Sequence, residues 1–311
     1  MKTTHPITLT VGPLQYWWPR QQLTQFYAEL AEGPAQTMVL GEVTCSRRNE
    51  FSFNDWLALG RDLQACGKTV RLATMPLLMS EAELRTLRRS VEQEEFEIEA
   101  GDAAALQAWS RLPISHRRPL VLGPQLNIYS ASALQEHLTE PGISAWVPAM
   151  ELSLDAIARI NPPGLGQTVA TEVFGFGRMP LAFSARCFTA RHHRLNKDQC
   201  EFRCRDDADG LLLRTGEGQP FLALNGIATQ SAAMQCLIAQ GPELRKAGVT
   251  RLRLSPCSRG FAEVLQQFDA VFNQGACAAA ALEQLQALPL PGALVHGFAQ
   301  RQPGMQEVAH V

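Results

Sequence analysis

The chain has 311 residues, of which 46% are hydrophobic and 19% charged, and its formal net charge is −2 at pH 7. This length and composition predict one or two domains with a large core, and the small net charge gives no indication of nucleic-acid binding or of an anionic membrane partner. The sequence lacks a run of about 18 apolar residues, and Met1–Thr10 lacks the apolar core of a secretory signal, so we expect a cytoplasmic protein without a transmembrane segment.

Short apolar runs alternate with helical patterns along most of the chain. In chain order, the predicted strands are Ile7–Val11, Thr37–Val43, Thr69–Met75, Phe96–Ala100, Leu120–Leu122, Ser144–Pro148, Thr168–Phe174 and Thr250–Leu254. The predicted helices are Gln21–Ala31, Asn54–Cys66, Ser80–Gln93, Asp102–Ser110, Ala131–Thr139, Leu154–Ile160, Ala232–Ala247, Gly260–Asp269 and Ala276–Leu288. Eight strands, mostly followed by helices, favour an α/β fold of the (β/α)8 TIM-barrel type over an open doubly wound sheet.

The alternation breaks in a polar segment that contains three of the eight cysteines. Two short strands in this segment, Gly210–Arg214 and Pro220–Asn225, flank the turn T-G-E-G-Q and predict an antiparallel hairpin. We therefore divide the chain into residues 1–174, the first seven strand–helix units; 175–231, a cysteine-bearing insertion with the hairpin; 232–290, the closing helix–strand–helix; and 291–311, a C-terminal tail.

The cysteines of the insertion are the strongest chemical signal. Cys187, Cys200 and Cys204 follow the pattern R-C-x12-C-x3-C, and Cys45 lies far upstream after the second strand. Loops after the second and seventh barrel strands emerge at the same face, so four thiolates could converge there, as a [4Fe–4S] cluster needs. The spacing also permits a zinc site, which His192 and His193 could complete in place of Cys45, or an exposed loop with ordinary thiols.

Five stretches carry a family resemblance: S-R-R-N-E-F-S at Ser46–Ser52, G-P-Q-L-N-I-Y-S at Gly123–Ser130, E-L-S-L-D-A-I at Glu151–Ile157, T-E-V-F-G-F-G-R-M-P-L-A-F-S-A-R-C-F at Thr171–Phe188, and G-F-A-Q-R-Q-P-G-M at Gly297–Met305. They resemble the collagenase-like peptidase family, and the resemblance covers nearly the whole chain. It implies a barrel-like domain and a [4Fe–4S] cluster, whose ligands would be Cys45, Cys187, Cys200 and Cys204.

Within the family, the short chain and its cysteine pattern resemble the members that serve oxygen-independent ubiquinone biosynthesis. Many relatives, including the UbiU-like partner type, have a cysteine about seven residues before the R-C pair, where this chain has Met179 or Pro180. Cys45 would supply the missing ligand. The resemblance implies a heterodimer with a UbiU-like protein, a polyprenylated aromatic quinone precursor as substrate, and ring hydroxylation without molecular oxygen.

Charged residues at the strand ends are candidates for the rest of the site, although no motif identifies a catalytic residue. Other relatives use a carboxylate oxygen donor, with prephenate suspected, and arginine binds carboxylates bidentately. Arg47, Arg48 and Arg253 could bind such a donor, or could instead form surface or inter-strand ion pairs. The carboxylate candidates are Glu42 and Glu172, with Glu99 as a further ion-pair partner.

Two other functions remain open from the sequence. The chain could be a non-catalytic subunit that transfers electrons and stabilises its partner, since a cluster held by four thiolates has no free iron to bind substrate. It could also be a peptidase, as the family name suggests. No H-E-x-x-H or G-x-S-x-G motif occurs, so a peptidase would need a thiol paired with a histidine such as His116 or His137.

Overall fold

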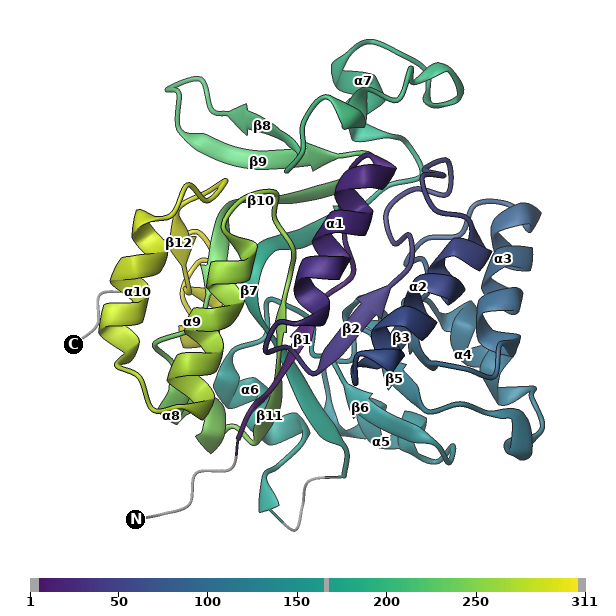
Figure 1. The fold of residues 1–311 in the computed structure, drawn as a ribbon, viewed down its shortest axis with the longest axis horizontal. Helices are drawn as coiled ribbons and strands as arrows, with labels where there is room; N and C mark the ends of the chain where they lie inside the picture. Colours follow the sequence, from purple (N-terminus) through teal and green to yellow (C-terminus); the bar gives the residue numbers. More distant parts are fainter. Residues whose placement is uncertain (1–5, 165–167, 307–311) are drawn as a thin grey trace.

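The computed structural model describes residues 6–164 and 168–306, and at its centre lies a closed barrel of parallel strands. Neighbouring strands pair in parallel from β1 to β7, and β11 closes the ring by pairing with both β7 and β1 (Figure 1). The predicted (β/α)8 architecture is therefore confirmed. The barrel strands are β1 (Thr8–Val11), β2 (Thr37–Leu40), β3 (Thr69–Ala73), β4 (Glu97–Ala100), β5 (Leu120–Leu122), β6 (Ile143–Trp146), β7 (Ala170–Phe183) and β11 (Val249–Leu254).

Helices cover the outside of the barrel, and several begin where a side chain caps the first turn. Ser52 and Asp55 form both halves of a capping box at α2, and the Ser80 hydroxyl accepts a hydrogen bond from the Glu83 backbone at α3. In the described ranges, no helix is long and apolar enough to span a membrane. The helices are α1 (Arg20–Ala31), α2 (Phe53–Ala65), α3 (Glu81–Glu92), α4 (Ala103–Ser110), α5 (Ala131–Leu138), α6 (Leu154–Ile160), α8 (Gly241–Lys246), α9 (Phe261–Asn273) and α10 (Ala278–Ala287).

A small antiparallel sheet extends the barrel at the carboxyl end of β7. The strand predicted to end at Phe174 continues to Phe183, and its second half pairs with β10 (Ala228–Cys236). Next in order come β9 (Pro220–Asn225) and β8 (Leu211–Arg214), which form the predicted hairpin. With the short helix α7 (Phe188–His192), the hairpin lies beyond this end of the barrel (Figure 1).

The helix predicted over Ala232–Ala247 is wrong for most of its length. Residues up to Cys236 belong to β10, and only Gly241–Lys246 is helical. Alanine, methionine, glutamine and leucine are good helix formers, and both faces of β10 are largely buried, so the strand shows no alternating pattern. Pairing with β7 and β9, which are distant in sequence, decides its conformation.

The C-terminal stretch packs against this extension. Strand β12 (Leu294–Val295) pairs in parallel with β10, and a short helical turn, Phe298–Gln300, follows. The last five residues of the predicted tail, 307–311, lie outside the described residues.

Candidate functional site

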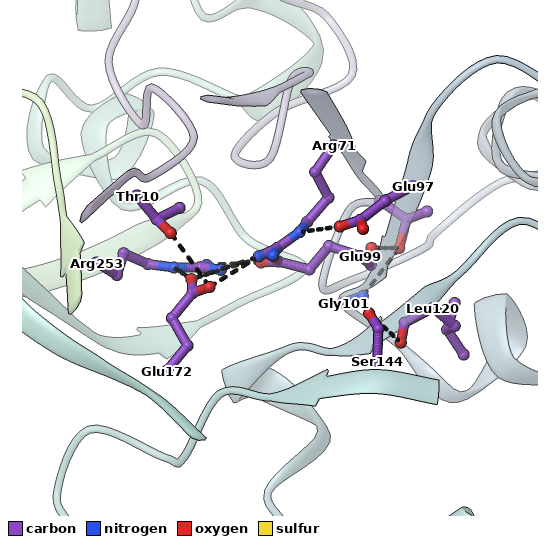
Figure 2. A network of polar contacts seen from close by, with 10 residues as sticks. Thr10, Arg71, Glu97, Glu99, Gly101, Leu120, Ser144, Glu172 and Arg253 are labelled. Atoms are coloured by element: carbon purple, nitrogen blue, oxygen red, sulfur yellow. Dashed lines mark hydrogen bonds and ion pairs between the residues drawn. The ribbon is translucent and has the colours of Figure 1, made fainter. Parts of the chain in front are cut away.

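Buried charged side chains form a network inside the barrel (Figure 2). The Arg253 guanidinium donates to both Glu99 carboxylate oxygens, at 2.5 and 2.6 Å, and to Glu172 Oε1 at 2.8 Å. Arg71 donates to Glu99 at 3.1 Å and to Glu172 at 3.2 Å, and Thr10 donates its hydroxyl to Glu172. These residues come from β1, β3, β4, β7 and β11, so the network joins strands across the barrel.

The charged side chains of this network are paired with one another. Burial alone would raise the pKa of Glu172, but the positive charges of Arg71 and Arg253 outweigh burial and lower it to about 2. Arg253 is 3% exposed and lines the barrel mouth, where a cavity of about 30 Å³ has room for roughly two waters. Arg253 and Glu172 are therefore partners of one another, as the ion-pair alternative predicted.

All four predicted cysteine ligands line one pocket outside the barrel axis. Cys45 lies in the loop after β2, and Cys187 caps the start of α7. Cys200 and Cys204 lie in or beside two short turns further along the insertion. None forms a disulfide within the described part of the chain. The fold thus brings together thiols from three separate stretches of sequence.

Basic side chains surround these thiols. Arg47, Arg48, Lys197 and Arg203 line the same pocket, where they can offset the charge of four thiolates. Burial raises the pKa of the Cys204 thiol, while the charge of Arg48 acts in the opposite direction. Burial also raises the pKa of the Cys45 and Cys187 thiols.

Arg48 is the most tightly held of the basic residues. It is 5% exposed, and its guanidinium donates to the Gln15 carbonyl at 2.6 Å and to Asn225 Oδ1 at 2.7 Å. Glu42 Oε1 lies 3.9 Å from it and accepts hydrogen bonds from the backbone N–H groups of Thr44 and Cys45. These contacts fix the β2 loop, and with it Cys45, against the hairpin.

Aromatic rings cover the pocket. Trp17 is 4% exposed and packs edge-on against Phe202, with 5.0 Å between ring centroids. The Arg205 guanidinium lies 4.0 Å from the Trp17 ring centroid, and Glu50 bonds both Arg205 and the Trp17 indole. Trp17 and Phe202 line the same pocket as the four thiols.

Four cysteines are a donor set that a [4Fe–4S] cluster or a tetrahedral zinc ion can use. In residues 6–164 and 168–306, no group of three His, Cys, Asp or Glu side chains is gathered closely enough to hold one metal ion. His192 and His193 pack against each other, with ring centroids 5.1 Å apart, and are not among the side chains that line this pocket.

The other predicted candidates do not share one cavity. Arg47 and Arg48 line the cysteine pocket, and Arg47 donates to the carbonyl oxygens of Lys197 and Asp198. Arg253 lies in the barrel with Glu172 and lines the mouth cavity, whose lining includes neither Arg47 nor Arg48.

Sequence reasoning missed the partners that hold these residues in place. Arg71 lies in an otherwise apolar strand, where a lone arginine was a usable signal of a buried partner. Gln15, Asn225 and Phe202 gave no such signal, because their contacts join segments far apart in the chain.

Comparison with known proteins relates this chain to one family. Residues 21–303 match the family model described as Peptidase family U32. The solved structure of the spore cortex-lytic enzyme SleL of Bacillus megaterium QM B1551 aligns with 88% of this chain and 76% of its own, at 9% identity and a TM-score of 0.45. Burkholderia cenocepacia dihydropteroate synthase aligns with 89% of this chain and 93% of its own, at 13% identity and a TM-score of 0.39. Both similarities are distant.

Proposed function

This chain belongs to peptidase family U32, and from that premise we propose that it is an iron–sulfur protein of oxygen-independent ubiquinone biosynthesis. It would be of the UbiV type and act with a UbiU-like partner, as a heterodimer, in hydroxylating the ring of a polyprenylated precursor. The observation that carries the proposal is the convergence of Cys45, Cys187, Cys200 and Cys204 on one pocket. The cysteine pattern supports the UbiV assignment within the family.

The residues around the pocket have distinct roles in this proposal. The four cysteines would hold the [4Fe–4S] cluster, which, when bound, supplies one-electron transfer. Arg48 lines the pocket with Cys204, and a positive charge near a ligand sulfur would tune the cluster's potential. Trp17 and Phe202 would form an apolar wall beside the cluster. The oxygen donor, a carboxylate such as prephenate, would need a cation other than Arg253, which the barrel network already engages.

The alternative of a non-catalytic subunit shares the same cysteine pocket. In that role the chain would pass electrons to its partner and stabilise it, and it would bind no substrate. The peptidase alternative has less support. His116, one histidine proposed for a thiol pair, is exposed and bonds Glu94 instead, and Cys187 is buried in the pocket.

Iron analysis of anaerobically purified protein tests the cluster. We expect about four irons and four sulfides per chain and an absorption band at about 400 nm, all lost in Cys45→Ala. Cys66→Ala is the matched control, because Cys66 is an exposed free thiol at the end of α2 and outside the pocket. Zinc in place of iron, or a Cys45→Ala spectrum equal to that of the wild type, would contradict the ligand set.

Ubiquinone content tests the pathway separately. In a host that lacks the native gene and grows without oxygen, the wild type and Cys66→Ala should restore ubiquinone, and Cys45→Ala should not. A Cys45→Ala protein that loses its iron but still restores ubiquinone would refute the proposed function. The assignment of Cys45 as a cluster ligand would still hold.

A further inference from the structure

A second cavity lies between α2 and α3, outside the barrel. Its volume is about 340 Å³, roughly ten times that of the barrel-mouth cavity. Its floor includes Gly41 and Thr74, which directly follow β2 and β3, so it opens at the same end of the barrel as the cysteine pocket. Its walls are mainly apolar, and their large members are Phe51, Phe53, Trp56, Leu72, Leu78 and Leu87.

Arg48 connects this cavity to the cysteines. Its side chain lines both the α2–α3 cavity and the cysteine pocket. Glu42, from the same loop, lines the α2–α3 cavity as well. A molecule at this end of the cavity would therefore lie one side chain away from the thiols.

The charged side chains that line the α2–α3 cavity near Arg48 disfavour an anionic ligand. The Arg48 guanidinium is already bonded to Gln15 and Asn225. Two carboxylates, Glu42 and Glu83, also line the cavity and would repel a carboxylate or phosphate. The two backbone hydrogen bonds of Glu42 both end on Oε1. Glu42 lines the cavity, and a carboxylate can accept a hydrogen bond from a ligand hydroxyl.

The volume limits the size of the ligand. A cavity of roughly 150 Å³ holds benzene, so by proportion this cavity takes roughly a dozen non-hydrogen atoms. A phenol ring with one isoprene unit has about that size. A longer tail can leave between the helices, because Ala82 and Thr86 line the cavity and are exposed to solvent.

We propose that the α2–α3 cavity binds a prenylated phenol, with the hydroxyl directed to Glu42 and the apolar chain between Phe53, Trp56 and Leu87. The identification of this ligand with the ubiquinone precursor rests on the proposed function, whereas the binding itself does not. Binding there would bring the aromatic ring to the Arg48 side of the cysteine pocket.

Calorimetric titration of the purified full-length chain with 2-prenylphenol tests the proposal. Thr86→Trp and Ser90→Phe place large side chains at two positions that line the cavity, one helical turn apart on α3. Arg85→Trp is the matched control, since Arg85 is an exposed neighbour on α3 that is not among the residues lining the cavity. Thermal melts establish which variants are folded.

We expect wild type and Arg85→Trp to bind within about twofold of each other, and both cavity variants to bind roughly tenfold more weakly, a loss of about 1.4 kcal/mol. The methyl ether of the probe, which cannot donate to Glu42, and an alkanoate of similar size should bind as weakly to the wild type. Absence of wild-type binding, or equal binding by the folded cavity variants, would overturn the proposal. If strains that carry the cavity variants make normal amounts of ubiquinone, the cavity does not bind the ubiquinone precursor, although it still binds the probe. If the wild-type protein contains no iron but binds the probe, only the proposed function is contradicted.

Discussion

The buried network predicts that Glu172→Gln destabilises the protein in a pH-dependent way. Glu172 is fully buried, and the charges of Arg71 and Arg253 lower its pKa from 4.5 to about 2 despite the opposing effect of burial. At about 1.4 kcal/mol per pKa unit, this corresponds to about 3 kcal/mol of stability at pH 7. Breaking one side of a buried ion pair costs roughly 3–5 kcal/mol in general, so the two magnitudes agree.

The sign of the pH dependence follows from the lowered pKa. Because the unfolded chain takes up the proton first as pH falls, the contribution of Glu172 is fully present above about pH 4.5 and is lost between about pH 4.5 and 2. At pH 3.5, about 1 kcal/mol of it should already be gone. The stability gap between wild type and Glu172→Gln should therefore narrow from about 3 to about 2 kcal/mol.

Urea unfolding at pH 7 and pH 3.5, followed by circular dichroism, measures this gap. Glu97→Gln is a suitable control, because Glu97 meets Arg71 at 3.5 Å with 23% of its side chain exposed. Such a partly solvated pair is worth less than about 1 kcal/mol. Equal stability of Glu172→Gln and wild type at pH 7, or a gap of the same size at both pH values, would refute the electrostatic reasoning.

Two further predictions concern local structure. Ser52→Ala removes the capping box with Asp55 and should lower stability by about 1 kcal/mol, so an unchanged melting temperature would contradict a role for this cap. Gly101→Ala places a Cβ only 2.5 Å from the Thr74 carbonyl oxygen and should cost about 1–3 kcal/mol in urea unfolding. Gly216→Ala, whose Cβ meets nothing within 4 Å, should be neutral, and equal effects at the two glycines would exclude this steric explanation.

The barrel strands could be predicted because each is a short apolar run next to a helical pattern. β1, β3 and β4 begin and end within two residues of the predictions. The charged residues inside strands, Arg71 and Glu172, interrupt these runs, and their burial depends on meeting one another across the barrel. Sequence periodicity reports which face of a strand is apolar, and it does not report which charges meet in the interior.

The order of strands along the chain predicts which loops lie at the same end of the barrel. It does not predict which side chains of those loops contact one another. Strand order places the loops after β2 and β7 at one end of the barrel, which is why Cys45 and Cys187 could be expected to lie near each other. The hydrogen bonds that seat Arg48 on Gln15 and Asn225 depend on how β9 approaches the β1 loop. That approach follows from the extension of β7 and from β10, whose strand the helical pattern concealed.

The cavities of this barrel differ in size and position, and these differences limit where a substrate can bind. At the barrel axis, Arg253 is bonded to Glu99 and Glu172, and the mouth cavity has room for little more than water. A substrate with an aromatic ring does not fit there unless the network opens, at the cost of exposing paired charges. The cysteine pocket and the α2–α3 cavity lie at the same end of the barrel but beside the axis, and Arg48 lines both. In the proposed function, electron transfer and ring binding therefore take place beside the barrel axis, and the loop between β2 and α2 contributes Cys45 to one site, Glu42 to the other and Arg48 to both.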